Sequence, residues 1–300
     1  MAIALKGDFI GFSFNEHRSE SLGIVRVSDG SRYNEDLVPT TQDKTVQVPG
    51  GDGFYYFGSD YTQRQFSINI AFDELTEKQF RELQQVFGTK ELGKLIFDER
   101  PYKYYMVKSS KPQLKYICFG KDGERIYKGE GTLTFTAYYP FAKSVFKFLN
   151  EYGNKNKDEW KEASGMKAEK GTYDIVSNNG SISVYNAGDL ETDFILKFSL
   201  PADNTPIGDI KITLSKENVG KVEAFLDLNG FSKKDADTGF QINTKTNLIE
   251  GFNAEGLTGT LYNENITQGD FFKIPPREEG YRISVTGATP IEIVYDYIYY

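Results

Sequence analysis

Residues 64–72 contain the clearest structural pattern in this chain. Every second side chain is apolar, so that Phe66, Ile68, Ile70 and Phe72 lie on one face of an extended segment. Ser67 and Asn69 fall on the opposite face. Strict alternation is typical of a β-strand with one buried face. The segment therefore predicts a strand that must pack against another layer of structure.

A short amphipathic helix is predicted to follow this strand and to supply that layer. Thr76 and Gln79 have the spacing of a capping box, and Gly88 can end the helix. Apolar residues recur at helical spacing between these two points. The residues predicted to form the buried side of the helix are Phe80, Leu83 and Phe87.

The composition favours a mainly β protein. The chain of 300 residues contains 20 Tyr and 23 Phe, and aromatic residues favour strands. No other segment is strongly helical. The length is sufficient for two domains with separate cores. We expect an N-terminal β-rich domain with one short α-helix, followed by a C-terminal β-sandwich.

Composition also indicates where the domains end. Residues 1–145 read as one domain. Residues 146–172 are charged, interrupted by glycine and poor in apolar residues, which predicts a linker. Residues 173–300 return to short alternating segments separated by turn signals, the pattern of a β-sandwich or barrel. Its last strands are predicted at Asp270–Ile274, Tyr281–Thr286 and Ile291–Tyr300.

Residues 28–53 form a polar stretch that is long for a connection between strands. Segments of this kind are usually functional loops or extended arms. Thr45 and Gln47 alternate with Val46 and Val48, which indicates that part of the stretch is a strand. Its low apolar content predicts a strand that lies outside the core.

The order of elements in the first domain resembles that of siphophage-type distal tail proteins, the hub subunits of the phage tail. The resemblance covers residues 64–142 and includes the segments IFDERPYKYY and GEGTLTFTAYYPFA. Residues 173–300 resemble the galectin-like or carbohydrate-module-like sandwich of the same proteins. This second resemblance is carried by SVYNAGD at residues 183–189 and by FFKIPP at residues 271–276.

The resemblance implies a structural protein and no enzyme. It also implies that the protein forms a hexameric ring at the distal end of the tail. This ring would connect the tail tube to the tip or baseplate and to the receptor-binding proteins. Residues 28–53 would form an arm that reaches over the neighbouring subunit; its candidate contacts are Tyr33, Val38, Val46 and Val48. The protein would be made in the cytoplasm of a bacterial host and function in the virion.

A carbohydrate-binding module that assists adsorption to the host surface is the alternative function. A sugar platform would need aromatic residues gathered on one exposed sheet face. Tyr295, Tyr297 and Tyr299 share one face of the last predicted strand. These rings are either that platform or part of a covered strand, and carbohydrate remains a possible partner.

The distribution of charge excludes some partners. Residues 1–150 carry 20 Lys and Arg against 19 Asp and Glu, whereas residues 151–300 carry 15 against 24. An acidic half is not suited to nucleic-acid or anionic-membrane binding. The first residues do not have the pattern of a secretory signal, and no apolar segment is long enough to span a bilayer.

The sequence contains no recognisable catalytic or metal motif, so we expect no catalytic residues, cofactor or metal. His17 is the single histidine and is interpreted as a loop residue. Cys118, the single cysteine, lies in a strand pattern and is expected to be buried. The adjacent pairs Asp73-Glu74 and Asp98-Glu99 point to opposite faces of any strand and are interpreted as solvated turns. The segment 235–239 is only a fragment of a calcium-loop pattern.

Overall fold

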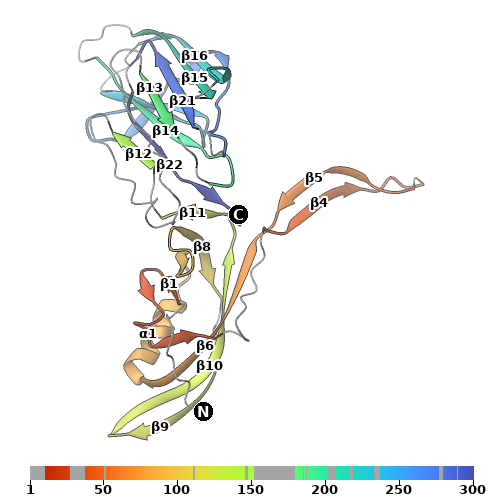
Figure 1. Cartoon of the computed structure of the whole chain (residues 1–300), viewed down its shortest axis with the longest axis vertical. Helices are drawn as coiled ribbons and strands as arrows, with labels where there is room; N and C mark the ends of the chain where they lie inside the picture. Colours follow the sequence, from red (N-terminus) through yellow and green to blue (C-terminus); the bar gives the residue numbers. More distant parts are fainter. Residues whose placement is uncertain are drawn as a thin grey trace. The chain divides into compact units, whose positions relative to one another are not determined.

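The computed structural model describes residues 11–27, 38–50, 52–110, 112–145, 148–151, 180–184, 186, 188–201, 207–216, 219–232, 237–276, 280–288 and 290–300. The chain divides into two compact units, Met1–Val145 with Tyr300, and Phe146–Tyr299. Strands dominate both units, and the described residues contain one α-helix (Figure 1). The prediction of a mainly β fold is confirmed.

The first unit is built from antiparallel strands and the helix α1, which packs on β6 and β10 through its apolar side. Its elements are β1 (Phe12–Phe14), β2 (His17–Arg18), β3 (Ile24–Arg26), β4 (Thr41–Val46), β5 (Tyr55–Tyr61), β6 (Arg64–Thr76), α1 (Glu77–Phe87), β7 (Gly93–Phe97), β8 (Lys103–Ser109), β9 (Gln113–Lys121), β10 (Glu124–Ala137) and β11 (Ala142–Ser144).

One long antiparallel pair organises this unit. β6 pairs with β10 from Arg64 opposite Ala137 to Thr76 opposite Ile126. The strands follow in the order β2-β1-β7-β8-β10-β6-β3, with β9 added beside β10. β9 pairs with the half of β10 nearer its start, and β8 pairs with the other half, at Phe135 and Thr136.

The helix α1 begins and packs as its sequence predicts. The side chain of Thr76 accepts a hydrogen bond from the Gln79 N–H, and the Gln79 side chain accepts one from the Thr76 N–H, which completes the capping box. Phe80, Leu83 and Phe87 are buried along one side of the helix. The Phe80 ring lies 6.4 Å from that of Phe72, in the alternating strand. α1 and β6 therefore share one core.

The second unit consists of two antiparallel sheets. One has the order β12-β22-β14-β17-β18-β19, and the other has the order β13-β21-β15-β16-β20. The elements are β12 (Phe148–Glu151), β13 (Ser181–Val184), β14 (Phe194–Ser199), β15 (Gly208–Lys216), β16 (Val222–Phe231), β17 (Gly239–Asn243), β18 (Leu248–Phe252), β19 (Thr258–Leu261), the 3-10 helix η1 (Asn263–Asn265), β20 (Ile266–Gly269), β21 (Tyr281–Thr286), β22 (Pro290–Tyr295) and β23 (Ile298–Tyr299).

Aromatic side chains join the two sheets into a sandwich. Phe231 of β16 lies 4.3 Å from Phe240 of β17, measured between ring centroids, and Phe240 stacks on Phe198 at 4.5 Å. All three rings are fully buried. Inward-facing residues of both sheets thus form one core, as expected for a β-sandwich.

Three sequence predictions in the second unit are wrong in detail. The predicted linker contains β12, because the backbone of Phe148–Glu151 pairs with β22; residues 152–172 lie outside the described residues. Asp270–Ile274 forms only an isolated bridge at Ile274, and the strand is β20, where the backbone pairs with β16. The last predicted strand is interrupted between β22 and β23, at residues 296–297.

Candidate assembly site

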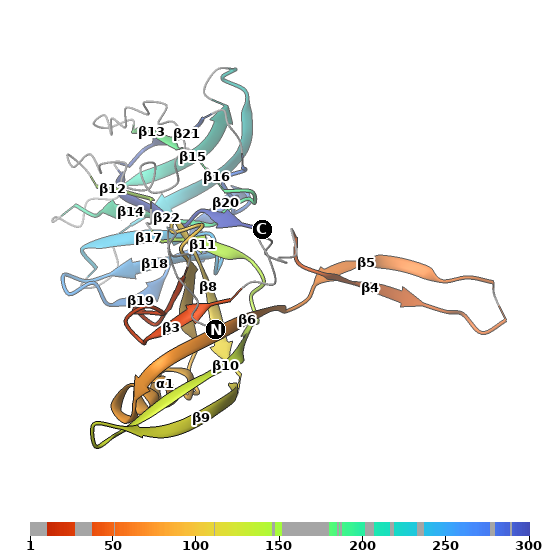
Figure 2. The same cartoon turned by 60° about the horizontal axis from the view of Figure 1, so that its bottom comes forward.

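β4 and β5 form a hairpin that is separate from the sheets of the first unit. They pair from Thr41 opposite Tyr61 to Val46 opposite Tyr55, and within the described residues they pair only with each other. Figures 1 and 2 show the hairpin leading away from the start of β6. We call residues 41–61 the arm. The side chains of the arm are not packed in a core, so they are available to contact another surface.

The base of the arm is held by hydrogen bonds and aromatic contacts. The backbone N–H of Thr62 donates to the carbonyl of Thr40 at 2.8 Å. The Tyr61 ring meets the Phe141 ring edge-on, with centroids 4.9 Å apart, and lies 6.5 Å from the Tyr300 ring. These contacts stiffen the point where the arm joins the sheet, because ring pairs add to the packing energy.

The half of the arm nearer the base is polar, and its charged and hydroxyl groups bind one another. Lys44 Nζ lies 2.6 Å from a carboxylate oxygen of Asp60. The Ser59 hydroxyl donates to Asp43 at 2.5 Å, and it also lies 2.7 Å from the Tyr56 hydroxyl. This half therefore needs no partner and can cross solvent.

The far half of the arm is apolar and exposed. Phe54, Tyr55, Tyr56 and Phe57 are between 63% and 68% exposed, and Val46 opposite them is also exposed. A bulge places Phe57 and Gly58 opposite the single residue Lys44, and Gly58 adopts the positive φ of 105° that this bend requires. A cluster of exposed rings on a monomer marks an interaction surface.

The structure places the predicted arm residues as follows. Val38, Val46 and Val48 are exposed, and Tyr33 lies outside the described residues. The sequence interpretation did not include the run Phe54–Phe57 among the contact residues. The available signal was four consecutive aromatic residues directly after the turn sequence Pro-Gly-Gly-Asp-Gly. Within the arm, Phe54–Phe57 make up the larger part of the exposed apolar side chains.

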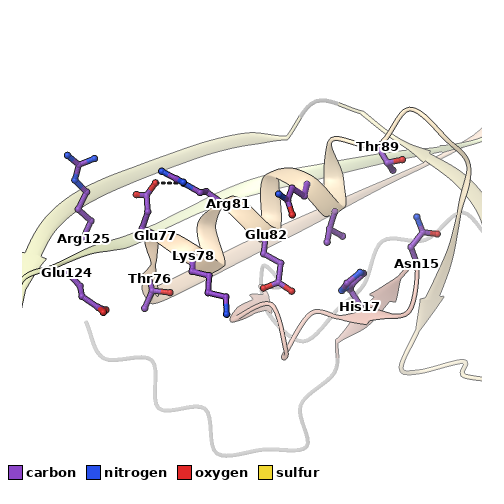
Figure 3. Close-up of a pocket in the computed structure, with 12 residues that line it drawn as sticks. Asn15, His17, Thr76, Glu77, Lys78, Arg81, Glu82, Thr89, Glu124 and Arg125 are labelled. Carbon is purple, nitrogen blue, oxygen red and sulfur yellow. Dashed lines mark hydrogen bonds and ion pairs between the residues drawn. The ribbon is translucent and has the colours of Figure 1, made fainter.

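A second candidate, an open groove of about 1360 Å³, runs along the length of α1 from Thr76 to Thr89 (Figure 3). Arg81 pairs with Glu77 along the helix at 2.9 Å, and the Tyr127 hydroxyl donates a short hydrogen bond to the same carboxylate. These hydrogen bonds, first that of Tyr127, lower the pKa of Glu77. The bond to Glu77 raises the pKa of Tyr127 to about 12. Both groups stabilise the helix start, which is a structural role.

The prediction of solvated turns is wrong for Asp73 and Glu74, which lie within β6, whereas Asp98 and Glu99 do lie in the turn after β7. Asp73 and Glu74 lie 3.1 Å from Lys128 and 2.8 Å from Lys121, respectively. Each carboxylate is thus neutralised by a different cation. In the other dipeptide, the two residues pair separately with Arg18 and Arg26. Among the described residues no group of three or more His, Cys, Asp or Glu could hold a metal ion.

Two residues with reactive side chains lie where the sequence did not place them. His17 is part of the two-residue strand β2, opposite Phe14, and is exposed. Cys118 is exposed, although its strand pattern predicted burial. The physical reason is that β9 lies at the edge of the sheet, so an alternating pattern there does not imply a cover. Asp237, in the calcium-loop fragment, is buried and accepts the Tyr262 hydroxyl at 2.8 Å.

The C-terminal tyrosines do not form an exposed platform. Tyr295, Tyr297 and Tyr299 are all buried. The rings of Tyr295 and Tyr297 meet edge-on at 5.8 Å. Of the two interpretations of this segment, the covered strand is therefore correct, and the sugar platform is not.

Comparison with known proteins gives a domain family and a fold. Residues 23–137 match the family described as the phage tail protein RIFT-related domain. The crystal structure of the Dit protein of phage SPP1, described as a paradigm of the hub adsorption apparatus in phages that infect Gram-positive bacteria, has the same fold. The TM-score is 0.59 at 13% identity, and the match covers 98% of this chain and 100% of that chain.

The baseplate of phage P2, in its activated conformation with calcium, is a weaker match. Its TM-score is 0.45 at 11% identity, over 96% of this chain and 98% of that chain. No curated protein matches the sequence. The resemblance to siphophage-type distal tail proteins is confirmed, by the domain family for residues 23–137 and by the fold for the whole chain.

No helix of the described residues is long and apolar enough to cross a membrane.

Proposed function

We propose that this chain is a structural protein of a phage tail: a distal tail protein that connects the tail tube to the tip or baseplate. The observation that carries the proposal is the phage tail domain at residues 23–137 within a chain whose whole fold is that of a tail hub protein. We expect its chemistry to be assembly alone, without a catalytic step.

The first unit would assemble as a closed ring of six subunits. The arm supports self-association, because its exposed rings at Phe54–Phe57 are uncovered in a single chain. Its contact with another part of a neighbouring copy would be heterologous, and a heterologous contact closes into a ring when the rotation between copies allows it. Val38, Val46 and Val48 are exposed as well, and Val46 pairs with Tyr55; all three would take part in the same contact.

The ring would bind the tail tube protein on one side and the tip, baseplate or receptor-binding proteins on the other. The protein would therefore be found in the virion after synthesis in the bacterial host. Carbohydrate binding by the second unit stays a prediction, and a glycan array with the full chain tests it. A positive array would add adsorption to the structural role.

Mass measurement in solution tests the proposed function. Light scattering at micromolar protein should give a mass that is a multiple of 34.0 kDa, with ring-shaped particles in negative stain. A strict monomer at high concentration, together with the absence of the protein from purified tails, would contradict the proposal.

A further inference from the structure

Two positively charged side chains are buried at the starts of β6 and β8. Arg64 is 4% exposed and Lys103 is 6% exposed. Arg64 is the first residue of β6, shortly after the arm, which ends at Tyr61, and Lys103 is the first residue of β8. A buried cation is costly unless hydrogen-bond acceptors surround it. The acceptors that these two side chains meet therefore define a specific arrangement.

The main-chain oxygen of Tyr300 lies at the centre of this arrangement. It accepts hydrogen bonds from Lys103 Nζ at 3.1 Å and from the Tyr105 hydroxyl at 3.3 Å. The same hydroxyl accepts a hydrogen bond from Arg64 Nη1 at 3.2 Å. Because a hydroxyl can donate one hydrogen bond and accept another, all four residues form one connected network. Hydrogen bonds in such a site are stronger than in water, since the local dielectric constant is low.

The side chain of Tyr300 contacts the base of the arm. Its ring meets the Phe141 ring edge-on at 6.1 Å and lies 6.5 Å from the Tyr61 ring, measured between centroids. Tyr61 and Phe141 also contact each other, at 4.9 Å. Tyr300 belongs to the first unit, so these contacts lie within one compact unit. One residue thus binds the last residue of the arm with its ring and the buried network with its main chain.

The connection between the arm and β6 is short and contains no regular structure. Thr62 and Gln63 lie between β5 and β6 and belong to neither strand. The hydrogen bonds from Thr62 to the carbonyl of Thr40 join the two sides of the arm to each other. Hinges are commonly a few residues of this kind, at the ends of elements. Rotation at Thr62 and Gln63 would therefore turn the arm unless contacts across this connection prevent it.

We propose that Tyr300 is a latch that sets the direction of the arm. Its ring holds Tyr61 on one side of the connection, and Lys103 and Tyr105 hold its main-chain oxygen on the other side. The inference goes beyond the proposed function, because it concerns the direction of the arm within a single chain, whatever surface the arm meets. A fixed direction would present the rings of Phe54–Phe57 in one orientation and reduce the conformational entropy that is lost on contact.

The distance between two spin labels measures the direction of the arm. The labels are attached at Thr45→Cys, in the paired part of β4, and at Gln85→Cys, on the exposed side of α1, in a chain that also carries Cys118→Ser. Double electron–electron resonance is recorded on labelled chain in an excess of unlabelled chain, so that only distances within one copy contribute. We expect one narrow distance distribution for this parent protein.

Two variants of the parent release the latch in different ways. Tyr300→Ala removes the ring and keeps the main-chain oxygen, whereas Lys103→Met removes one donor and keeps a side chain of similar length. We expect each to replace the narrow distribution with a broad one. Lys94→Met is the matched control, because Lys94 is exposed and its Nζ lies 5.1 Å from the centroid of the Tyr104 ring. Lys103 makes the same kind of contact, at 5.7 Å from Tyr105. The control should keep the narrow distribution.

Thermal unfolding shows which variants are folded, and Tyr300→Ala alone decides the test if Lys103→Met does not fold. A broad distribution in the parent, an unchanged narrow distribution in the folded latch variants, or equal broadening in Lys94→Met would overturn the inference. Light scattering on the unlabelled chain tests the proposed function separately. Monomers whose arm responds to the latch variants contradict only the ring, and rings whose arm does not respond contradict only the latch.

Discussion

The hydroxyl of Tyr127 donates a hydrogen bond to the carboxylate of Glu77, and this bond ties the first turn of α1 to β10. The Tyr127 ring also stacks on Phe80, with centroids 4.4 Å apart. One side chain thus joins the polar start of the helix to its apolar face. On the neighbouring strand β9, Cys118 is the residue that pairs with Tyr127.

This hydrogen bond predicts that the stability of the fold decreases both at low pH and at high pH. The lowered pKa of Glu77 means that its contribution to stability is present above its unfolded value of 4.5 and is lost as the pH falls through the folded value. The pKa of Tyr127 is raised from 10.0 to about 12, so its contribution is present below pH 10 and is lost as the pH rises toward 12. NMR of ring-labelled tyrosine should show this late titration.

Glu77→Gln is the matched variant for this titration, because it removes the charge and keeps the size of the side chain. We expect the Tyr127 pKa to return toward its ordinary value, and Tyr127→Phe to remove the resonance. A Tyr127 signal that titrates in the ordinary range in the native chain would show that the hydrogen bond is absent.

Phe80→Ala should destabilise the first unit by about 3–5 kcal/mol, because the ring is buried between Phe72 and Tyr127 and its removal leaves a cavity. Urea unfolding measures the change. Gln85→Ala, at an exposed position of the same helix, is the control and should change stability little. Equal midpoints for the two variants would place Phe80 outside the core.

Changing Phe54, Tyr55, Tyr56 and Phe57 together to serine should abolish self-association and leave the unfolding midpoint of the chain nearly unchanged. The reason is that these rings are exposed and contribute little to the core of a single chain. Light scattering and thermal unfolding measure the two effects. A large loss of stability in the monomer would mean that the rings pack within their own chain.

Gly251→Ala should destabilise the second unit by about 1–3 kcal/mol, because an added methyl group overpacks a filled site. A Cβ at this position would lie 2.1 Å from Oδ2 of Asp237, which also accepts the Tyr262 hydroxyl. Gly259→Ala is the control, since a Cβ there meets nothing within 4 Å. Equal unfolding midpoints of the two variants would show that the Asp237 carboxylate moves freely.

The sequence by itself determined the elements whose signals are local. The alternation in β6 and the capping box of α1 depend on residues a few positions apart, and the structure reproduces both. The mainly β class follows from the same periodicity, repeated along the chain. The alternation also identified which side chains of β6 share a face, because the direction of a side chain is fixed by backbone geometry.

Only the tertiary structure decided which faces are covered. The pattern around Cys118 is that of a strand, but β9 is an edge and its thiol is exposed. The tyrosines of the last strands are buried, and the rings of Phe54–Phe57 are not, although all lie in strand-like sequence. The sequence did not predict β12 and β20, because these segments form strands only through pairing with β22 and β16, respectively. Burial and pairing depend on distant residues, which a local pattern does not contain.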